Sequence, residues 1–539
     1  MSLPIILIIT SFPPRKCGIA TYSQDLIKAI EDKYESSFII KVCALKKKGT
    51  SLEYPDQVGY ILNTWDEKEY VNLALELNEN ELIEVIYLQH EFGLYEGVYG
   101  AYLISFLKHI KKPVITTFHT VLSNPDMQRK TILQQIAFYS ASVIVMTKHS
   151  SKILSMEYDI APSKVTIIPH GTHLIKPVAK SSQNGFPFEH KKILATFGLL
   201  SEGKSIETAL SALPKIIEKF PNIIYLIIGK THPEVIKNEG EKYRDFLKEK
   251  VRQLGIEKEV LFINKYLSLD ILLEYLQRTD IYLFTSKDPQ QAVSGTLAYA
   301  LSAGCPVVST PIPHALELLD GAGLNFDFNN NDQLADAVIL LLSNNSLMYE
   351  MHMSAIHRIS PTAWQNAAMA HLQIAYKLDK LIDTQIAYKT PPILLDHIKR
   401  MTTPRGMIQF AIVADPDNSS GYTLDDNARA LIAVAKHFDL TGKFDDLHLI
   451  HIYLNFILFC QQEDGSFLNY VSFEEQFGIK NQTINLEDSN GRAIWALGEY
   501  LSLGLLIDYH LQIQIEEAFV KSLPIVENFQ SPRAIAFAI

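Results

Sequence analysis

Apolar and polar residues alternate in two different periods along the first part of the chain. Short apolar runs of the kind found in buried strands occupy residues 5–9, 38–44, 85–89, 114–118, 143–146 and 165–168. Between them lie stretches that carry apolar residues on one helical face, such as 22–30 and 132–139. A continuous apolar run is typical of a strand covered on both faces, and strand–helix alternation indicates a parallel sheet. The pattern therefore predicts a first α/β domain.

The same alternation restarts after residues 181–189, a polar segment that we interpret as a linker. The second series of predicted strands lies at 193–197, 223–229, 260–264, 281–285, 306–309 and 323–326. Helices are predicted between them at 206–220, 241–254, 268–277 and 295–303. Parallel sheets bind ligands beyond the carboxyl ends of their strands, so we expect two Rossmann-like domains that face one cleft.

The strand pattern fades after about residue 385, and long helical stretches follow. Residues 425–431 (DDNARAL) match residues 488–494 (DSNGRAI) in type and order, which is typical of stacked helical hairpins. We predict Rossmann-like domains at 1–172 and 173–360, a crossover helix and linker at 361–384, and an all-α domain at 385–539. The helical pattern stops without a capping signal, so we expect this last domain to be incomplete.

Composition and net charge argue against several classes of function. The net charge of −11 disfavours nucleic acid as a partner, because no global positive field is present. The four cysteines form no CxxC pair, which fits a reducing cytoplasm and argues against a zinc site. No apolar run has the length of a membrane span, and the first run is better explained as a strand than as a signal peptide. We expect a cytoplasmic protein, with peripheral membrane contact and oligomeric state left open.

Polar motifs follow several predicted strands. Gly18, Ile19 and Ala20 come after the first strand and open a helix, where backbone N–H groups can hold an anion. The other candidates at strand ends are His90 with Glu91, His119, His170, Gly198 with Lys204, and Thr231 with His232. Lys204 suits a phosphate, although most lysines are simply solvated.

Ser294, Gly295 and Thr296 start a predicted helix of small residues. Its free amides and partial positive charge would favour a diphosphate, while the hydroxyl groups could instead cap the helix. The sequence does not separate these two interpretations.

Taken together, the segments PPRKCGIAT, QHEFG, TTFHT, IPHG, TFGLLSEGK, IIGKTHPE and SGTLAYALSAG resemble, in that order, the family 4 retaining glycosyltransferases of GT-B fold, over residues 1–380. The resemblance implies an acceptor-side first domain and a second domain that binds a nucleotide-sugar donor such as GDP-mannose or UDP-glucose. It also implies transfer of a hexose to a carbohydrate acceptor with retention of configuration. The helical tail resembles the (α/α) toroid domains of carbohydrate enzymes.

The resemblance also assigns roles to single residues. Gly18 would lie beside the donor phosphates, His119 would contact the transferred sugar, and Lys204 would neutralise the diphosphate. The family's arginine before this lysine is replaced by Leu199, and its paired glutamates fall on Gln291 and Tyr299. These departures resemble a branch with the SGTLAYA form.

Two further points complete the expectations. Lys204 and the amides at 294–296 would stabilise the leaving group's charge, so we expect no metal and no other cofactor.

Two rival functions remain open at this level, a glycoside phosphorylase of GT-B fold and a non-catalytic nucleotide- or sugar-binding protein. A second sugar site, with carboxylates suited to acid–base chemistry, is hypothesised at Asp425, Asp426, Glu487 and Asp488.

Overall fold

The computed structural model describes residues 3–15, 17–49, 52–175, 188, 190–291, 293–378, 381, 386–387, 389–412, 414–504 and 509–539. Its contacts divide the chain into two compact units, Met1–Lys389 and Thr390–Ile539. The sequence places the start of the helical region at residue 385. The linker predicted at 181–189 lies outside the described residues except for Phe188.

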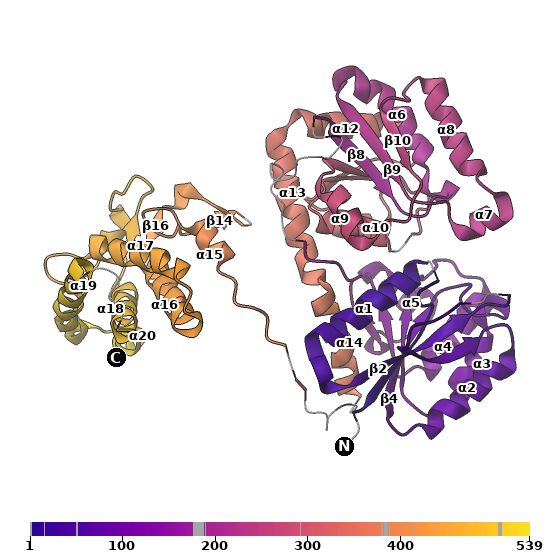
Figure 1. Ribbon diagram of the computed structural model, residues 1–539, viewed down its shortest axis with the longest axis horizontal. Helices are drawn as coiled ribbons and strands as arrows, with labels where there is room; N and C mark the ends of the chain where they lie inside the picture. Colours follow the sequence, from indigo (N-terminus) through magenta and orange to yellow (C-terminus); the bar gives the residue numbers. More distant parts are fainter. Residues whose placement is uncertain are drawn as a thin grey trace. The chain divides into compact units, whose positions relative to one another are not determined.

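The first unit contains two parallel sheets, one in each of two lobes (Figure 1). The N-terminal sheet has the order β3 (Val58–Asn63), β2 (Ile39–Lys46), β1 (Ile5–Thr10), β4 (Ile83–His90), β5 (Val114–Phe118), β6 (Ser142–Val145) and β7 (Val165–Ile167). All pairs are parallel, with Ile8 opposite Val42 on one side and Tyr87 on the other. This confirms the predicted α/β fold class.

Helices cover both faces of the N-terminal sheet because its central strands are apolar on both sides. Ile5, Leu7 and Ile9 of β1 contribute to one core, together with α2 (Glu67–Glu79), α3 (Tyr102–His109), α4 (Met127–Tyr139) and α5 (Lys148–Glu157). Ile6 and Ile8 contribute to the opposite core with α1 (Gly18–Tyr34) and α14 (Trp364–Lys377). The predicted crossover helix therefore packs, as α14, on the N-terminal lobe (Figure 1).

The C-terminal sheet repeats the arrangement with the order β10 (Val260–Ile263), β9 (Ile223–Ile228), β8 (Lys192–Phe197), β11 (Ile281–Phe284), β12 (Val307–Ser309) and β13 (Gly323–Asn325). One face is covered by α6 (Ile206–Lys219), α8 (Lys242–Leu254) and α12 (Asn331–Ser343). The other is covered by α9 (Leu269–Gln277), α10 (Gly295–Ser302), α11 (Pro313–Leu318) and α13 (Asn345–Ile359). The helix α7 (Pro233–Glu239) follows β9.

The second unit is mainly helical. Its helices are α15 (Asp396–Met401), α16 (Leu424–Thr441), α17 (Asp445–Cys460), α18 (Glu487–Ser502), α19 (Tyr509–Ser522) and α20 (Pro532–Ala538). Two short antiparallel pairs correct the expectation of an all-α domain: β14 (Ala411–Ile412) with β15 (Asp415–Pro416), and β16 (Tyr422–Thr423) with β17 (Tyr470–Val471). The second pair joins the segment just before α16 to the segment that follows α17.

The repeated motif has a structural counterpart in this unit. Asn427 of the first copy accepts a hydrogen bond from the backbone N–H of Met407 and donates one to its carbonyl. Asn490 of the second copy makes the same two bonds with Phe467. Each copy thus uses one buried asparagine to fasten an extended segment to the start of a long helix. Within the described residues, no helix is both long and apolar enough to cross a membrane.

Candidate functional site

Lys204 lies on a turn that two strand ends hold in place. The turn, Glu202–Lys204, follows β8, and Ser205 after it adopts a left-handed conformation with φ of 46°. The Thr285 hydroxyl, beyond β11, donates to the Lys204 carbonyl at 2.6 Å, and the Lys287 N–H donates to the Gly203 carbonyl at 3.0 Å. The loop that carries the lysine is therefore fixed at the carboxyl edge of the C-terminal sheet.

The Lys204 ammonium is partly buried and makes no ion pair with any carboxylate of the described residues. Its Nζ donates a long hydrogen bond of 3.5 Å to the Phe197 carbonyl. Burial lowers the pKa of Lys204 to about 8, because the charged form loses solvation without gaining a counter-charge. An anionic ligand beside Nζ would restore that counter-charge.

Helix α10 begins next to this lysine. The Ser294 side chain accepts a hydrogen bond from the Leu297 N–H and so caps the helix, while the Ser294 N–H donates to His314 Nδ1 at 2.9 Å. Burial lowers the pKa of His314 to about 3, which keeps its ring neutral and able to accept. Capping is thus the role of the Ser294 hydroxyl. The backbone N–H groups of Gly295 and Thr296 have no hydrogen-bond partner among the described residues, as is usual for the first turn of a helix.

Gly198 links the lysine and the helix start. Its φ of +124° is a conformation that favours glycine. A Cβ atom at this position would lie 3.0 Å from Lys204 Nζ and 3.1 Å from Thr296 Cγ2. The ammonium and the first turn of α10 therefore both lie close to one backbone position, Gly198.

On the N-terminal lobe, α1 begins without a side-chain cap, so the N–H groups of Gly18, Ile19 and Ala20 stay free of side-chain acceptors. Nothing lies within 4 Å of a Cβ placed at Gly18, although the Ala20 side chain itself is buried. One turn later, the Thr21 hydroxyl lies 3.4 Å from the Tyr266 hydroxyl of the other lobe. The start of α1 consequently faces the C-terminal lobe with open space around Gly18.

Two of the predicted histidines meet at Tyr22, a residue that the sequence did not single out. The rings of His119 and His170 lie 4.8 Å and 5.3 Å from the Tyr22 ring, both edge-on. His119 Nε2 is 2.7 Å from Gln89 Oε1, and burial lowers the pKa of His119 to about 3. His119 is consequently neutral at physiological pH, and its ring position is fixed.

His170 reaches across to the second lobe. Its Nδ1 pairs with the Gly171 carbonyl at 2.8 Å, and its Nε2 would lie 3.2 Å from a Cβ at Gly295. The start of α10 therefore lies against the N-terminal lobe and close to the histidine pair. The structure brings together Lys204, Gly198, Gly295, Thr296, His170 and His119 along this contact between the lobes.

Four other predicted residues have different positions. His90 is fully buried among Phe92, Tyr95 and Phe118, so it has no exposed atom for a donor. Both Glu91 carboxylate oxygens accept internal hydrogen bonds, from the Phe92 N–H and the Thr120 hydroxyl.

Thr231 is buried and donates to Glu241, beside the buried guanidinium of Arg244. His232 lies next to it, half-buried, after the bridge between Leu200 and Thr231. Parallel-sheet topology places strand ends at one edge but does not decide whether a side chain there points outward or into the core.

The side chains at the two positions of the expected glutamate pair, Gln291 and Tyr299, also make internal hydrogen bonds. Gln291 accepts from the Ser286 hydroxyl at 2.7 Å and donates to the Val293 carbonyl at 3.2 Å, so its amide organises the loop before α10. Tyr299 is 8% exposed and donates to Asp25 of α1 at 2.8 Å. Tyr299 thus connects the lobes, a role that the sequence did not indicate.

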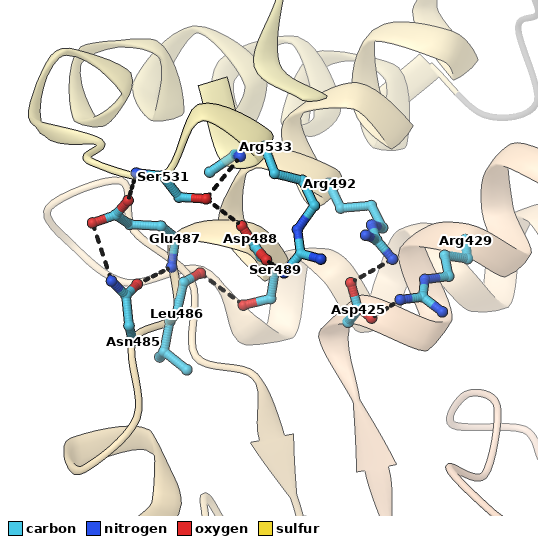
Figure 2. A network of polar contacts seen from close by, with 11 residues as sticks. Asp425, Arg429, Asn485, Leu486, Glu487, Asp488, Ser489, Arg492, Ser531 and Arg533 are labelled. Carbon is cyan, nitrogen blue, oxygen red and sulfur yellow. Dashed lines mark hydrogen bonds and ion pairs between the residues drawn. The ribbon is translucent and has the colours of Figure 1, made fainter. Parts of the chain in front are cut away.

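The structure separates the four carboxylates of the hypothesised second sugar site into two groups. Asp426 accepts from the Thr423 hydroxyl at the cap of α16, and Glu487 accepts from the N–H groups of Gln530 and Ser531. Asp425 and Asp488 instead line one hollow, where each faces arginine (Figure 2). Burial raises the pKa of Asp425, whereas Arg533 is the main cause that holds the pKa of Asp488 below its usual value. The two carboxyl groups therefore differ in proton affinity, and the acid–base interpretation of this pair stays a prediction.

Among the described residues, no group of histidine, cysteine and carboxylate side chains has the arrangement of a metal site. All four cysteines are free thiols.

Comparison with known proteins locates the family signal on the second lobe. Residues 178–358 match the family described as Glycosyl transferases group 1. A D-inositol 3-phosphate glycosyltransferase of Corynebacterium diphtheriae is 24% identical over 277 residues, which cover 48% of this chain and 63% of that protein. The chain thus spans less than two thirds of that relative's length.

Solved structures share the fold. HepE of Anabaena, crystallised with UDP, is 15% identical with a TM-score of 0.54, covering 70% of this chain and all of that one. Sucrose-phosphate synthase of Thermosynechococcus elongatus is 16% identical with a TM-score of 0.57, covering 70% and 99%. Together with the two parallel sheets, these likenesses establish the GT-B fold.

Proposed function

We propose that this protein is a glycosyltransferase that moves a hexose from a nucleotide-sugar donor to a carbohydrate acceptor, without a metal ion and with retention of configuration. The observation that carries the proposal is the position of Lys204 Nζ and Thr296 close to Gly198, with no carboxylate of the described residues paired to the ammonium. The match of residues 178–358 to Glycosyl transferases group 1 supports it, as does the UDP bound to HepE, a protein of the same fold.

The chemistry follows from charge. Transfer breaks the bond between the anomeric carbon and a β-phosphate oxygen, and that oxygen leaves with negative charge. The acceptor hydroxyl oxygen forms the new bond to the anomeric carbon and passes its proton to the departing phosphate oxygen. Lys204, together with the free amides of Gly295 and Thr296, would stabilise the departing diphosphate. These groups supply positive charge from the chain itself, so the proposed step needs no metal.

The neutral histidine pair would form the sugar side of the site. His119 and His170 are held against Tyr22, and His170 also approaches Gly295 at the start of α10. A sugar attached to a diphosphate at α10 would therefore lie beside them. Neutral imidazoles exchange hydrogen bonds with hydroxyl groups without adding charge next to the anomeric centre.

A nucleotide-sugar screen tests the proposal. UDP-glucose, GDP-mannose and ADP-glucose are each incubated with the protein, with and without mono- and disaccharide acceptors, and nucleoside diphosphate release is measured. We expect release from one donor, in the presence of EDTA as well as in its absence. Disaccharide cleavage by orthophosphate without any nucleotide would favour a phosphorylase instead. Tight nucleotide binding without release would favour a binding protein.

A further inference from the structure

The helical unit contains a hollow of about 200 Å³ at the starts of α16 and α18. Figure 2 shows the side chains that project there from the two copies of the repeated motif and from α20. Its lining includes Asp425, Asp488, Arg429, Arg492, Arg533 and Asn469. Pockets for drug-sized ligands are larger, from about 300 Å³ upward, so this hollow suits one small polar molecule.

The charged groups of the hollow form an incomplete network. Asp425 lies between two guanidinium groups, 2.6 Å from Arg429 and 3.0 Å from Arg492, and Asp488 pairs with Arg533. Three cations therefore face two carboxylates, which leaves one positive charge in excess. Arginine presents several N–H groups in a fixed plane, which suits a carboxylate or phosphate from outside.

Two nearly buried groups in this lining lack part of their hydrogen bonding. Asn469 is 7% exposed and accepts the Asp425 N–H through Oδ1 at 3.0 Å, but its Nδ2 bonds to none of the described residues. Arg492 is 9% exposed, and its Nε likewise has no partner among the described residues. Arg492 Nε is closed off from solvent, whereas Asn469 lines the hollow. Buried polar groups normally have partners, so the free Nδ2 donor of Asn469 indicates a ligand.

We propose that this hollow binds a single sugar unit that carries one anionic group, either a carboxylate or a phosphate. The excess guanidinium charge recognises the anion. Each ionised carboxylate has about four acceptor positions, of which Asp425 uses two for Arg429 and Arg492, and Asp488 two for Arg533 and Ser531. The remaining positions can accept further hydrogen bonds, while both carboxylates would repel a ligand that is purely anionic. Sugar hydroxyl groups supply the donors for such bonds. The ligand therefore combines hydroxyl groups with one negative charge.

This site is separate from the proposed transfer site, because its residues all belong to the second unit. Its existence does not depend on the glycosyltransferase proposal. The experiment consequently includes a variant of each site in the full-length chain, so that failure of one proposal is distinguishable from failure of the other.

Isothermal titration calorimetry in a phosphate-free buffer measures binding of glucuronate, glucose 6-phosphate, glucose and inorganic phosphate. We expect at least one of the two anionic sugars to bind at least about tenfold more tightly than glucose and than phosphate. The sugar that binds shows whether the anion is a carboxylate or a phosphate. Equal affinity for glucose would overturn the role of the arginines, and equal affinity for phosphate the role of the hydroxyl groups.

The variant Asn469→Asp keeps the acceptor oxygen for the Asp425 N–H but removes the free Nδ2 donor and adds a negative charge. We expect it to weaken binding of the anionic sugar at least about tenfold. Asn455→Asp makes the same charge change at an exposed position of α17 and should leave binding unchanged. Arg429→Gln, at a side chain that is 57% exposed, provides a second loss of affinity that does not threaten folding.

Thermal unfolding without ligand checks that each variant is folded. Unchanged affinity in Arg429→Gln, or in folded Asn469→Asp, would remove the hollow as the binding site. Lys204→Ala should not change the affinity, since it alters only the α/β unit. Binding that is lost in Lys204→Ala but kept in Asn469→Asp would place the sugar at the transfer site and overturn this inference. No binding of either anionic sugar to the wild-type protein would do the same.

Discussion

The Tyr299 hydroxyl donates a hydrogen bond of 2.8 Å to the Asp25 carboxylate and thereby joins the second turn of α10 to α1 of the other lobe. The same Asp25 oxygen lies 3.3 Å from His173 Nε2, which belongs to the segment between the lobes. The second turn of α10 thus bonds to the other lobe, while the first turn carries the amides that we propose hold the donor diphosphate.

Tyr299→Phe should destabilise the α/β unit. The variant leaves the partly buried Asp25 carboxylate with one partner fewer, so we expect the unfolding free energy to fall by about 1–2 kcal/mol. Urea denaturation followed by tryptophan fluorescence measures this change. Tyr22→Phe is the matched control, because the buried Tyr22 hydroxyl has no hydrogen-bond partner among the described residues and its loss should be nearly neutral. Equal effects of the two variants would show that the Tyr299–Asp25 bond contributes nothing.

Lys204→Ala should reduce turnover at saturating donor at least about tenfold, which corresponds to roughly 1.4 kcal/mol of lost charge stabilisation in the transition state. Steady-state release of nucleoside diphosphate gives the rate. Lys219→Ala, at an exposed position near the end of α6, removes the same charge away from the site and serves as the control. A rate for Lys204→Ala that equals the wild-type rate would discard the proposed role of this lysine.

The pH dependence of kcat/KM for the donor should reflect the ionisation of Lys204. Burial lowers the pKa of Lys204 to about 8, so raising the pH through that value removes the proton and kcat/KM for the donor should fall. Lys204→Arg keeps its charge over this range and should show no such fall.

The fall in kcat/KM could not be explained by unfolding of the protein on deprotonation of Lys204. Because the folded-state pKa lies below the unfolded one, this group makes folding more favourable as pH rises between them. A wild-type profile that stays flat to pH 9.5, or a parallel fall in the arginine variant, would contradict the assignment.

His119→Ala should impair transfer while leaving nucleoside diphosphate affinity within about twofold of wild type. The ring lies beside Tyr22 and His170 on the N-terminal lobe, whereas the proposed diphosphate contacts come from Lys204 and α10. Calorimetry with the diphosphate and a transfer assay separate the two effects. An equal loss of binding and transfer would make His119 a structural residue.

Gly18→Ala tests whether this glycine is kept for a ligand. A Cβ at Gly18 meets nothing within 4 Å, so the melting temperature should stay unchanged while donor affinity falls. Gly171→Ala is the contrasting variant, because its Cβ would come within 2.2 Å of Trp364 and should lower stability strongly. Unaltered donor affinity in Gly18→Ala would remove the start of α1 from the donor site.

The sequence predicted the two parallel sheets because their central strands are apolar on both faces and helices alternate with them. It missed β3, since that edge strand is only partly buried and carries a mixed pattern. It also assigned Gly198, Lys204 and Thr296 to one donor site, and the structure places these three residues close together, at the edge where the carboxyl ends of the strands lie. Periodicity can be seen in neighbouring residues, and the rule for strand ends holds for parallel sheets in general. Both could therefore be applied to the sequence alone.

The direction of individual side chains was decided only by tertiary packing. His90 ends a strand and Thr231 follows one, much as His119 and Lys204 follow strands, yet both are buried: His90 packs among aromatic rings and Thr231 donates to Glu241. The contact between Tyr299 and Asp25 joins residues 274 positions apart, and no local pattern encodes that distance. The chain's own pattern therefore determined the architecture and the edge at which a site forms. The folded structure decided which side chains reach that edge, because each orientation depends on partners far away in the sequence.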